Sequence, residues 1–119
     1  MSVRVELEKL LEVAAGFGTV PMLLTVDGSG RPRASAVAVQ WDGEVATVRA
    51  GQRSVANCAE RPLVSLLWPA PAGERFALLV DGEVQGTRPD PDQEGEKAGG
   101  IVTVRATTAI LHVVDRPHA

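Results

Sequence analysis

Hydrophobic residues recur at two different spacings along this chain, and the spacing changes near residue 16. From Ser2 to Ala15 they recur every three or four positions with charged residues between them, which is typical of an amphipathic helix, here with Ser2 as its N-cap. Gly16 and Gly18 end that pattern. Short apolar runs separated by turn residues follow, and these are typical of strands. The chain is therefore predicted to be one N-terminal helix followed by a β-rich remainder.

Six segments have the composition of strands: residues 20–26, 34–40, 44–49, 63–68, 75–85 and 101–114. The first three are joined by short turns, so they must be antiparallel, because a parallel connection needs a dozen or more residues. Residues 51–61 predict one short helix that ends at Pro62. Residues 87–100 have the composition of a loop or a partly disordered segment, where we expect no chemistry.

These elements predict a mainly β fold in a single domain, residues 1–119. An open sheet so rich in valine and leucine would expose edges that aggregate, so we expect the strands to close into a small antiparallel barrel. A length of 119 residues and a hydrophobic fraction of 45% suit one globular core.

Charge and residue counts exclude several classes of function. The net charge of −3 argues against a general nucleic-acid-binding surface, which needs clustered Lys and Arg. Cys58 is the only cysteine, and His112 and His118 are too few for a metal cluster, so we expect neither a disulfide nor a metal site. No segment has the length of a membrane span or the apolar core of a signal peptide, so we expect a cytoplasmic protein.

Two segments carry candidate binding chemistry. Arg33 begins a strand of small side chains, against which a flat ligand can lie; the alternative is an ordinary barrel wall with a solvated arginine. Further along, a strand runs through Gly51 into a helix that carries Arg53, Ser54 and Asn57. Free N–H groups and the helix dipole favour an anion there, whereas the alternative is an ordinary cap beside a solvated arginine.

Other reactive side chains give weaker patterns. Ser65, Asp81 and His112 show no spacing typical of a catalytic triad, so nucleophilic hydrolysis is not expected. Trp41 and Trp68 stand at strand ends, where large aromatic side chains usually anchor a core or an interface. No catalytic acid or base is identified from the sequence.

Four segments together carry a resemblance to a known family. They are GRPRASAVAV from Gly30, WDGE from Trp41, RSVAN from Arg53 and RPLVSLLW from Arg61. In their order and spacing across residues 17–86 they resemble the pyridoxamine 5′-phosphate oxidase-like superfamily of FMN-binding split barrels, which includes flavin- and deazaflavin-dependent oxidoreductases. The resemblance implies a six-stranded antiparallel split β-barrel of Greek-key type, with an N-terminal helix and one short helix between strands. It also implies a homodimer with two cofactor sites at its interface, for FMN or, alternatively, a deazaflavin.

Carried over by position, the implied cofactor site consists of Arg33, Ala34, Ser35, Ala36, Val37, Val48, Arg49, Arg53, Ser54 and Asn57. Arg33 would meet the cofactor phosphate, residues 34–37 would border the ring system, and residues 53–57 would complete the anion pocket. Val48 and Arg49 would end the strand beneath the phosphate.

The chain departs from the family pattern at three positions. The family often has lysine where Ser54 stands, threonine or serine where Val48 stands, and a lysine or polar residue near Ala38. One lost charge-assisted bond, at ~1.5–3 kcal/mol, weakens affinity roughly ten- to a hundredfold, and Arg49 and Arg53 are expected to compensate. The chain also lacks the C-terminal extension that binds the vitamin substrate in the oxidases themselves, so we do not expect that substrate.

The expected function is that of a flavin- or deazaflavin-dependent oxidoreductase acting on an unidentified small molecule, in which the cofactor supplies the redox chemistry. Two alternatives remain open at this point. One is a non-catalytic flavin carrier or sensor, which the lack of an acid or base would allow. The other is a dimeric split barrel that has lost cofactor binding, because of the residues at positions 48 and 54.

Overall fold

The computed structural model describes residues 2–115 of the chain and is mainly β, as predicted. Its elements, in order, are β1 (Ser2–Arg4), the 3₁₀ helix η1 (Leu7–Lys9), α1 (Leu10–Ala15), β2 (Met22–Val26), β3 (Pro32–Ala36), β4 (Ala38–Asp42), β5 (Val45–Ala50), α2 (Gln52–Glu60), β6 (Leu63–Trp68), β7 (Phe76–Pro89) and β8 (Gly100–Val113). All strands belong to one antiparallel sheet in the order β3-β2-β6-β7-β8-β5-β4, with β1 paired to β8. Among the described residues no helix is long and apolar enough to cross a membrane.

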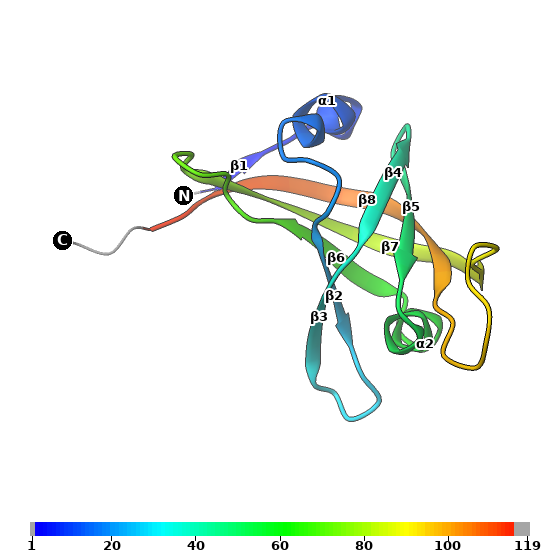
Figure 1. Cartoon of the computed structure of the whole chain (residues 1–119). Coiled ribbons are helices and arrows are strands. Elements are labelled where there is room, and N and C mark those ends of the chain that lie inside the picture. The colour runs from blue at the N-terminus through cyan, green and yellow to red at the C-terminus, as the bar shows by residue number, and fades with distance from the viewer. Residues whose placement is uncertain (1, 116–119) are drawn as a thin grey trace.

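One bent strand forms both ends of this sheet. The predicted strand 34–40 is divided at Val37 into β3, which pairs with β2, and β4, which pairs with β5. The Val37 N–H donates to the Pro21 carbonyl at 3.1 Å and the Val39 N–H donates to the Thr19 carbonyl at 2.9 Å, so pairing continues across the bend. The sheet therefore curls until its end strands are continuous in the chain, which is the split-barrel form (Figure 1).

The two longest strands, β7 and β8, have 14 residues each, and their ladder contains two register shifts beside Gly82 and Gly86. Such bulges bend a strand and increase its twist. A Cβ atom at Gly82 would lie 2.5 Å from Val104 Cγ1 and 2.9 Å from the Arg105 carbonyl oxygen. Glycine at position 82 thus allows the close approach of β8 at the point where the ladder curls.

The N-terminal segment differs from its prediction, which was one helix over residues 2–15. Ser2–Arg4 forms β1 and pairs with residues 110–112 of β8, which adds a strand to the predicted six. The helical pattern holds only further on, where Leu10 and Ala14, four residues apart, are buried. Pairing with an open strand of the sheet therefore outweighs the helical spacing of the first residues.

The core fills the inside of the curled sheet, and α1 and α2 lie at opposite ends of it (Figure 1). Trp68 is only 1% exposed, and its indole N–H donates to the Gly18 carbonyl at 2.9 Å. Trp41 stacks on it with 6.1 Å between ring centroids. Both tryptophans therefore pack in or against the core, as expected, and α2 adds Cys58 to it.

The segment between β7 and β8 is held by an ion-pair network, although residues 87–100 were predicted to be a loop or partly disordered. Asp90 is 2% exposed and accepts hydrogen bonds on both carboxylate oxygens from Arg49 Nη1, at 2.8 and 2.9 Å. The Asp92 N–H and the Gln93 side chain also donate to it. A buried carboxylate with these donors fixes the loop to β5, which composition alone does not show.

We expect Gly82→Ala to destabilise the protein by ~1–3 kcal/mol, because its new methyl group would overlap β8. Gly86→Ala in the same strand is the matched control, since a Cβ there meets nothing within 4 Å. Urea unfolding followed by circular dichroism measures both free energies. Equal stability of the two variants would show that β8 does not require the glycine.

We expect Asp90→Asn to lower the melting temperature at pH 7. The hydrogen bond from the Asp92 N–H and the pairing with Arg49 lower the pKa of Asp90 below its usual value. Such a carboxylate stabilises the fold above its unfolded pKa, near 4, and this stabilisation is lost as pH falls through the lower folded pKa. The difference between wild type and variant should therefore shrink on acidification in thermal melts from pH 7 to pH 3. Asp42→Asn, at an exposed aspartate of β4 outside this network, is the control, because Asp92 also pairs with Arg49, at 3.1 Å. An unchanged melting temperature for Asp90→Asn at pH 7 would refute the role.

Candidate functional site

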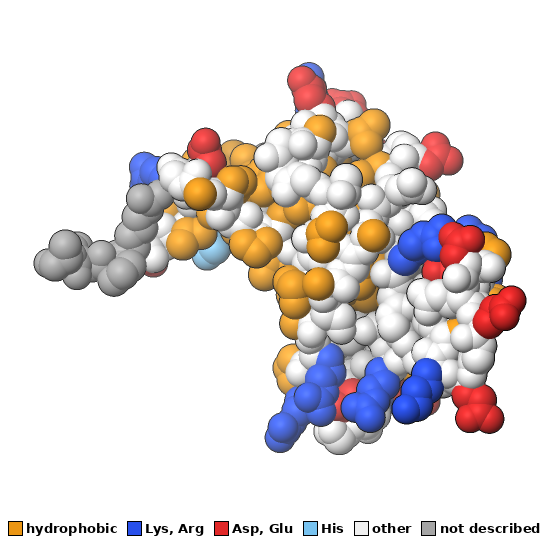
Figure 2. Space-filling model, in the orientation of Figure 1, with side chains coloured by type: hydrophobic (Ala, Val, Ile, Leu, Met, Phe, Trp, Pro, Cys, Tyr) orange, Lys and Arg blue, Asp and Glu red, His pale blue; other side chains and the backbone are white. Residues whose placement is uncertain are grey.

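A pocket of about 290 Å³ lies between the first turn of α2 and β3, and we call it the α2 pocket. It is lined by Asp27, Arg33, Ala34, Ser35, Arg53, Ser54, Ala56 and Asn57. Six of these residues are ones that the sequence predicts for the cofactor site; Asp27 and Ala56 are not. Figure 2 shows Lys and Arg side chains gathered at this end of the molecule, below β3 and α2.

The register of the sheet and the start of α2 bring these residues together. Ser35 on β3 stands opposite Leu23 of β2. The Ser35 hydroxyl lies 3.1 Å from the hydroxyl of Ser54, which is one of the two buried residues of α2. One turn further along α2, the Asn57 side-chain amide donates to the Thr25 hydroxyl at 3.2 Å. These two side-chain hydrogen bonds join the helix to the β2–β3 hairpin and form the inner wall of the pocket.

Asp27 gives the pocket a fixed negative charge beside Arg33. Its Oδ1 accepts hydrogen bonds from the Ser29 hydroxyl at 2.7 Å, the Ser29 N–H at 2.9 Å and the Arg31 N–H at 3.0 Å. Its Oδ2 accepts from Arg33 Nε at 3.0 Å. The Ser29 hydroxyl, followed by the Arg31 N–H and Arg33, lowers the pKa of Asp27 far below its usual value, so it is ionised at physiological pH.

Arg53 differs from Arg33 in its pairing. It is exposed in the first turn of α2 and makes no side-chain hydrogen bond or ion pair with any of residues 2–115. The first N–H groups of a helix have no acceptor within it, and no side chain caps α2 after its N-cap, Gly51. A guanidinium with free donors therefore stands beside free N–H groups, an arrangement that suits an oxyanion.

Four of the predicted site residues lie outside the α2 pocket. Val48 has no exposed surface and Val37 is 3% exposed, so both side chains belong to the core. Arg49 is paired with Asp90, and Ala36 lies exposed on β3. The pocket thus has two arginines rather than the three that the sequence suggests.

Sequence reasoning missed Asp27 because the Asp-Gly pair was taken only as a turn signal. An aspartate that begins a glycine-rich turn commonly binds the N–H groups two or more residues on, which was the available signal. That its other oxygen pairs with Arg33 depends on the β2–β3 register, in which Thr25 stands opposite Arg33.

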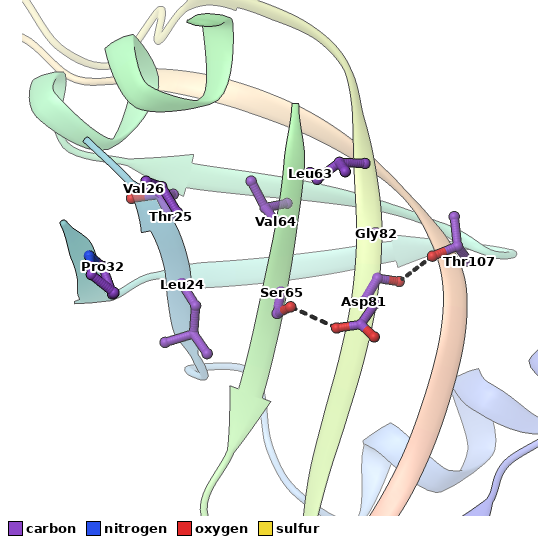
Figure 3. Close-up of a pocket in the computed structure, with 10 residues that line it drawn as sticks. All are labelled: Leu24, Thr25, Val26, Pro32, Leu63, Val64, Ser65, Asp81, Gly82 and Thr107. Carbon is purple, nitrogen blue, oxygen red and sulfur yellow. Dashed lines mark hydrogen bonds between the residues drawn. The ribbon is translucent and has the colours of Figure 1, made fainter. Parts of the chain in front are cut away.

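A second and larger pocket, about 450 Å³, lies on the outer face of the sheet over β2, β6 and β7, and we call it the outer pocket (Figure 3). Its lining is mostly apolar and includes Leu24, Val26 and Leu63, the last of them 74% exposed. On its floor Ser65 donates to the Asp81 carboxylate at 2.6 Å (Figure 3). Ser65 and Asp81 do not form a triad with His112. The β8 residue opposite Asp81 is Thr108, and His112 lies four residues beyond it.

Few side chains in the described part of the chain offer acid–base or metal chemistry. Burial raises the pKa of the Cys58 thiol to about 11, so it is not a nucleophile at neutral pH. His112 is exposed on β8 and hydrogen-bonds Ser2 at 3.2 Å. Residues 2–115 contain no cluster of three groups that could hold a metal ion, and His118 lies outside them.

Comparison with known proteins finds relatives similar in sequence and solved structures similar in fold. No protein-family model matches the chain. Uncharacterised proteins of Mycobacterium bovis and Mycobacterium tuberculosis are each 33% identical to it over 121 positions, which cover 92% of this chain and 80% of theirs.

Several solved structures share the fold at low sequence identity. An F420 reductase has a TM-score of 0.64 and 24% identity over 76% of this chain and 88% of its own. A member of the pyridoxinephosphate oxidase family from Clostridium acetobutylicum has a TM-score of 0.70 and 13% identity, and the match covers 92% of this chain and 91% of its own. An FMN-binding protein from Syntrophomonas wolfei has a TM-score of 0.68 and 13% identity, over 92% of this chain and 88% of its own. A heme-binding protein of Mycobacterium smegmatis also shares the fold, with a TM-score of 0.65 and 18% identity over 90% of this chain and 54% of its own. The chain therefore belongs to one family with the two mycobacterial proteins, and it has the split-barrel fold of the pyridoxinephosphate oxidase family member and the FMN-binding protein, as its sequence predicts.

Proposed function

We propose that this protein binds FMN or a deazaflavin by its phosphate in the α2 pocket and acts as an oxidoreductase on a small molecule. The observation that carries the proposal is the meeting of Arg33, Arg53 and the first turn of α2 at one pocket. An F420 reductase and an FMN-binding protein share the fold, which supports a cofactor of this type.

The two faces of β3 support separate roles for phosphate and ring. Side chains alternate along a strand, so Arg33 and Ser35 point toward α2, whereas the side chains of Ala34 and Ala36 point to the outer face. Ala34 also borders the α2 pocket, because it lies between Arg33 and Ser35. On the outer face Ala34 stands opposite Leu24, a residue of the outer pocket. The phosphate would bind on the α2 side, and the small alanines leave room for a flat ring on the outer face.

The bound cofactor would supply hydride transfer, as flavins and deazaflavins do. This chain would supply anion binding by Arg53 and the α2 N–H groups, orientation by the Ser35–Ser54 wall, and an apolar surface beside the ring that excludes water. A non-catalytic carrier or sensor would use the same residues, and reduction by a nicotinamide donor separates the two. Heme is less well supported, because none of the residues lining the α2 pocket is a histidine, cysteine, methionine or tyrosine.

The direct test is the visible spectrum of the purified protein, with mass spectrometry of whatever the denatured protein releases. A flavin or deazaflavin chromophore, or uptake of either one below millimolar concentration, would support the proposal. A colourless protein that takes up neither would refute it and leave the third alternative, a split barrel without cofactor binding.

We also propose a homodimer in which a second copy of the chain covers the outer face. Apolar side chains point outward there from two adjacent strands, among them Leu24 and Val26 on β2 and Leu63 on β6. Figure 2 shows hydrophobic side chains gathered over β2, β3 and β6. Contiguous apolar surface of this kind is typical of an interface, and a partner on it would close the ring side of the cofactor site.

We expect Arg53→Ala to weaken FMN or deazaflavin binding roughly ten- to a hundredfold, the effect of one charge-assisted bond of ~1.5–3 kcal/mol. Fluorescence titration measures the affinity, and the rise in melting temperature with excess cofactor provides a second readout. Arg105→Ala, an exposed arginine of β8 outside the pocket, is the control. Equal affinities for wild type and Arg53→Ala would remove Arg53 from the site.

We expect Leu63→Glu to convert the dimer into a monomer, because it buries a charge in the proposed interface. Light scattering at micromolar concentration measures the mass. Leu11→Glu is the matched control, since Leu11 is 50% exposed on α1 and does not line the outer pocket. A monomeric mass for the wild-type protein would contradict the dimer.

A further inference from the structure

A row of residues crosses the outer face of the sheet from the proposed ring position to Asp81. Ala34 stands opposite Leu24, and Leu24 stands opposite Ser65. Ser65 in turn stands opposite Asp81. Neighbouring strands lie about 4.8 Å apart, so Asp81, three strands from Ala34, stands roughly 14 Å from it along the sheet. The outer pocket covers the part of this row beyond Ala34 and leaves room for a second small molecule beside the ring.

Asp81 is held in place, but its charge is unpaired. The Ser65 hydroxyl donates to its Oδ1 at 2.6 Å (Figure 3), and the Thr108 hydroxyl donates to its Oδ2 at 3.1 Å. Both hydroxyls are neutral, and no Lys or Arg among residues 2–115 forms an ion pair with Asp81. Each carboxylate oxygen has more than one lone pair, so both keep an acceptor site for a ligand.

The other side chains of the outer pocket carry no charge. Its walls are apolar, with Leu24 and Val26 from β2 and Leu63 and Val64 from β6. Asp81 is the one charged residue in the lining that the described part of the chain provides. A mostly apolar cavity with few polar groups is typical of a small-molecule site, in which the polar groups fix the ligand's orientation. This lining suits an apolar molecule with one positively charged end.

Building on the cofactor site proposed above, we propose that the outer pocket is the substrate site and that Asp81 selects an apolar molecule with a cationic nitrogen, such as an ammonium or a protonated heterocycle. In the proposed dimer the second copy covers this face. A carboxylate withdrawn from water is strongly destabilised unless a cation pairs with it. A cationic ligand supplies that charge, whereas a neutral analogue leaves Asp81 without a counter-ion and an anionic analogue is repelled.

The first test varies only the charged end of the ligand. Naphthylmethylamine, naphthylmethanol and naphthoate share one apolar body and carry a positive, a neutral and a negative group at neutral pH. Their affinities for the wild-type protein are measured by NMR titration at low ionic strength, where charge pairs are least screened. We expect the amine to bind about tenfold more tightly than the alcohol, and naphthoate to bind more weakly than the alcohol.

The second test removes the carboxylate charge. Asp81→Asn keeps the shape of the side chain, and its oxygen can still accept a hydrogen bond from Ser65. We expect amine affinity to fall about tenfold and alcohol affinity to change by less than about twofold. Asp42→Asn, the same substitution at an exposed aspartate outside the pocket, is the matched control and should leave both affinities unchanged. Light scattering of Asp81→Asn measures whether the substitution changes the oligomeric state.

The third test concerns the position of the ligand beside the ring. When FMN or a deazaflavin is bound, addition of naphthylmethylamine should change the visible absorption of the cofactor, because the outer pocket adjoins the proposed ring position. In Asp81→Asn the same change should require about tenfold more amine.

Several results would overturn the inference while leaving the cofactor site intact. Equal affinities for the amine and the alcohol, or an amine affinity that Asp81→Asn does not change, would reject selection by Asp81. An equal loss in Asp42→Asn would show only general attraction of a cation to an acidic protein. A monomeric Asp81→Asn variant with unchanged amine affinity would assign Asp81 to the contact between copies.

Failure of the cofactor site gives a different result. If neither FMN nor a deazaflavin binds, the proposed function is refuted. A preference for the amine that disappears in Asp81→Asn would then still support a site for a cation in the outer pocket.

Discussion

The bend at Val37 is the constraint on which the rest of this structure depends. Because β3 and β4 are one strand, the sheet must curl until its first and last ladders meet at that residue. β5 then returns along β4 and runs through Gly51 directly into α2. The first turn of α2 is thereby placed against β3, and Arg53 reaches the same pocket as Arg33, twenty positions earlier in the sequence.

The bent strand also separates two kinds of surface. One side of β3 faces α2 with a hydroxyl and a guanidinium, and the other presents alanines to an apolar outer face. This alternation, a direct property of extended backbone, would let one short strand serve the charged phosphate and the flat ring of the proposed cofactor at once. The same fold in an F420 reductase, an FMN-binding protein and a heme-binding protein shows that the scaffold does not dictate the ligand. In the proposed site, the residues on the two faces of β3 would determine the ligand.

Much of this arrangement could be predicted from the sequence, and the failures have physical causes. Turn residues and apolar runs located the long strands and α2, because these signals are local. The first residues were predicted to be helical but form β1, since pairing with β8 is a contact between the two ends of the chain. Arg49 was predicted to lie beneath the phosphate, yet it is paired with Asp90, whose burial has no signature in composition.

The charge of the site shows the same limit. Arg33 and Arg53 were expected to act together and they line one pocket, but the aspartate that neutralises half of their charge was assigned only to a turn. Local sequence motifs identified Arg33 and Arg53 as candidate anion-binding residues. The register of β2 against β3 pairs Arg33 with Asp27 and leaves Arg53 as the unpaired arginine of the pocket. Which arginine of the α2 pocket is unpaired therefore depends on a contact that the sequence does not display.

A crystal structure of the protein with its bound cofactor tests the central claim most directly. The account predicts the phosphate within hydrogen-bonding distance of Arg53 and the first N–H groups of α2, with the ring system over Ala34 and Ala36 and against a second copy of the chain. A cofactor whose phosphate lies away from α2, with Arg53 in solvent, would contradict it.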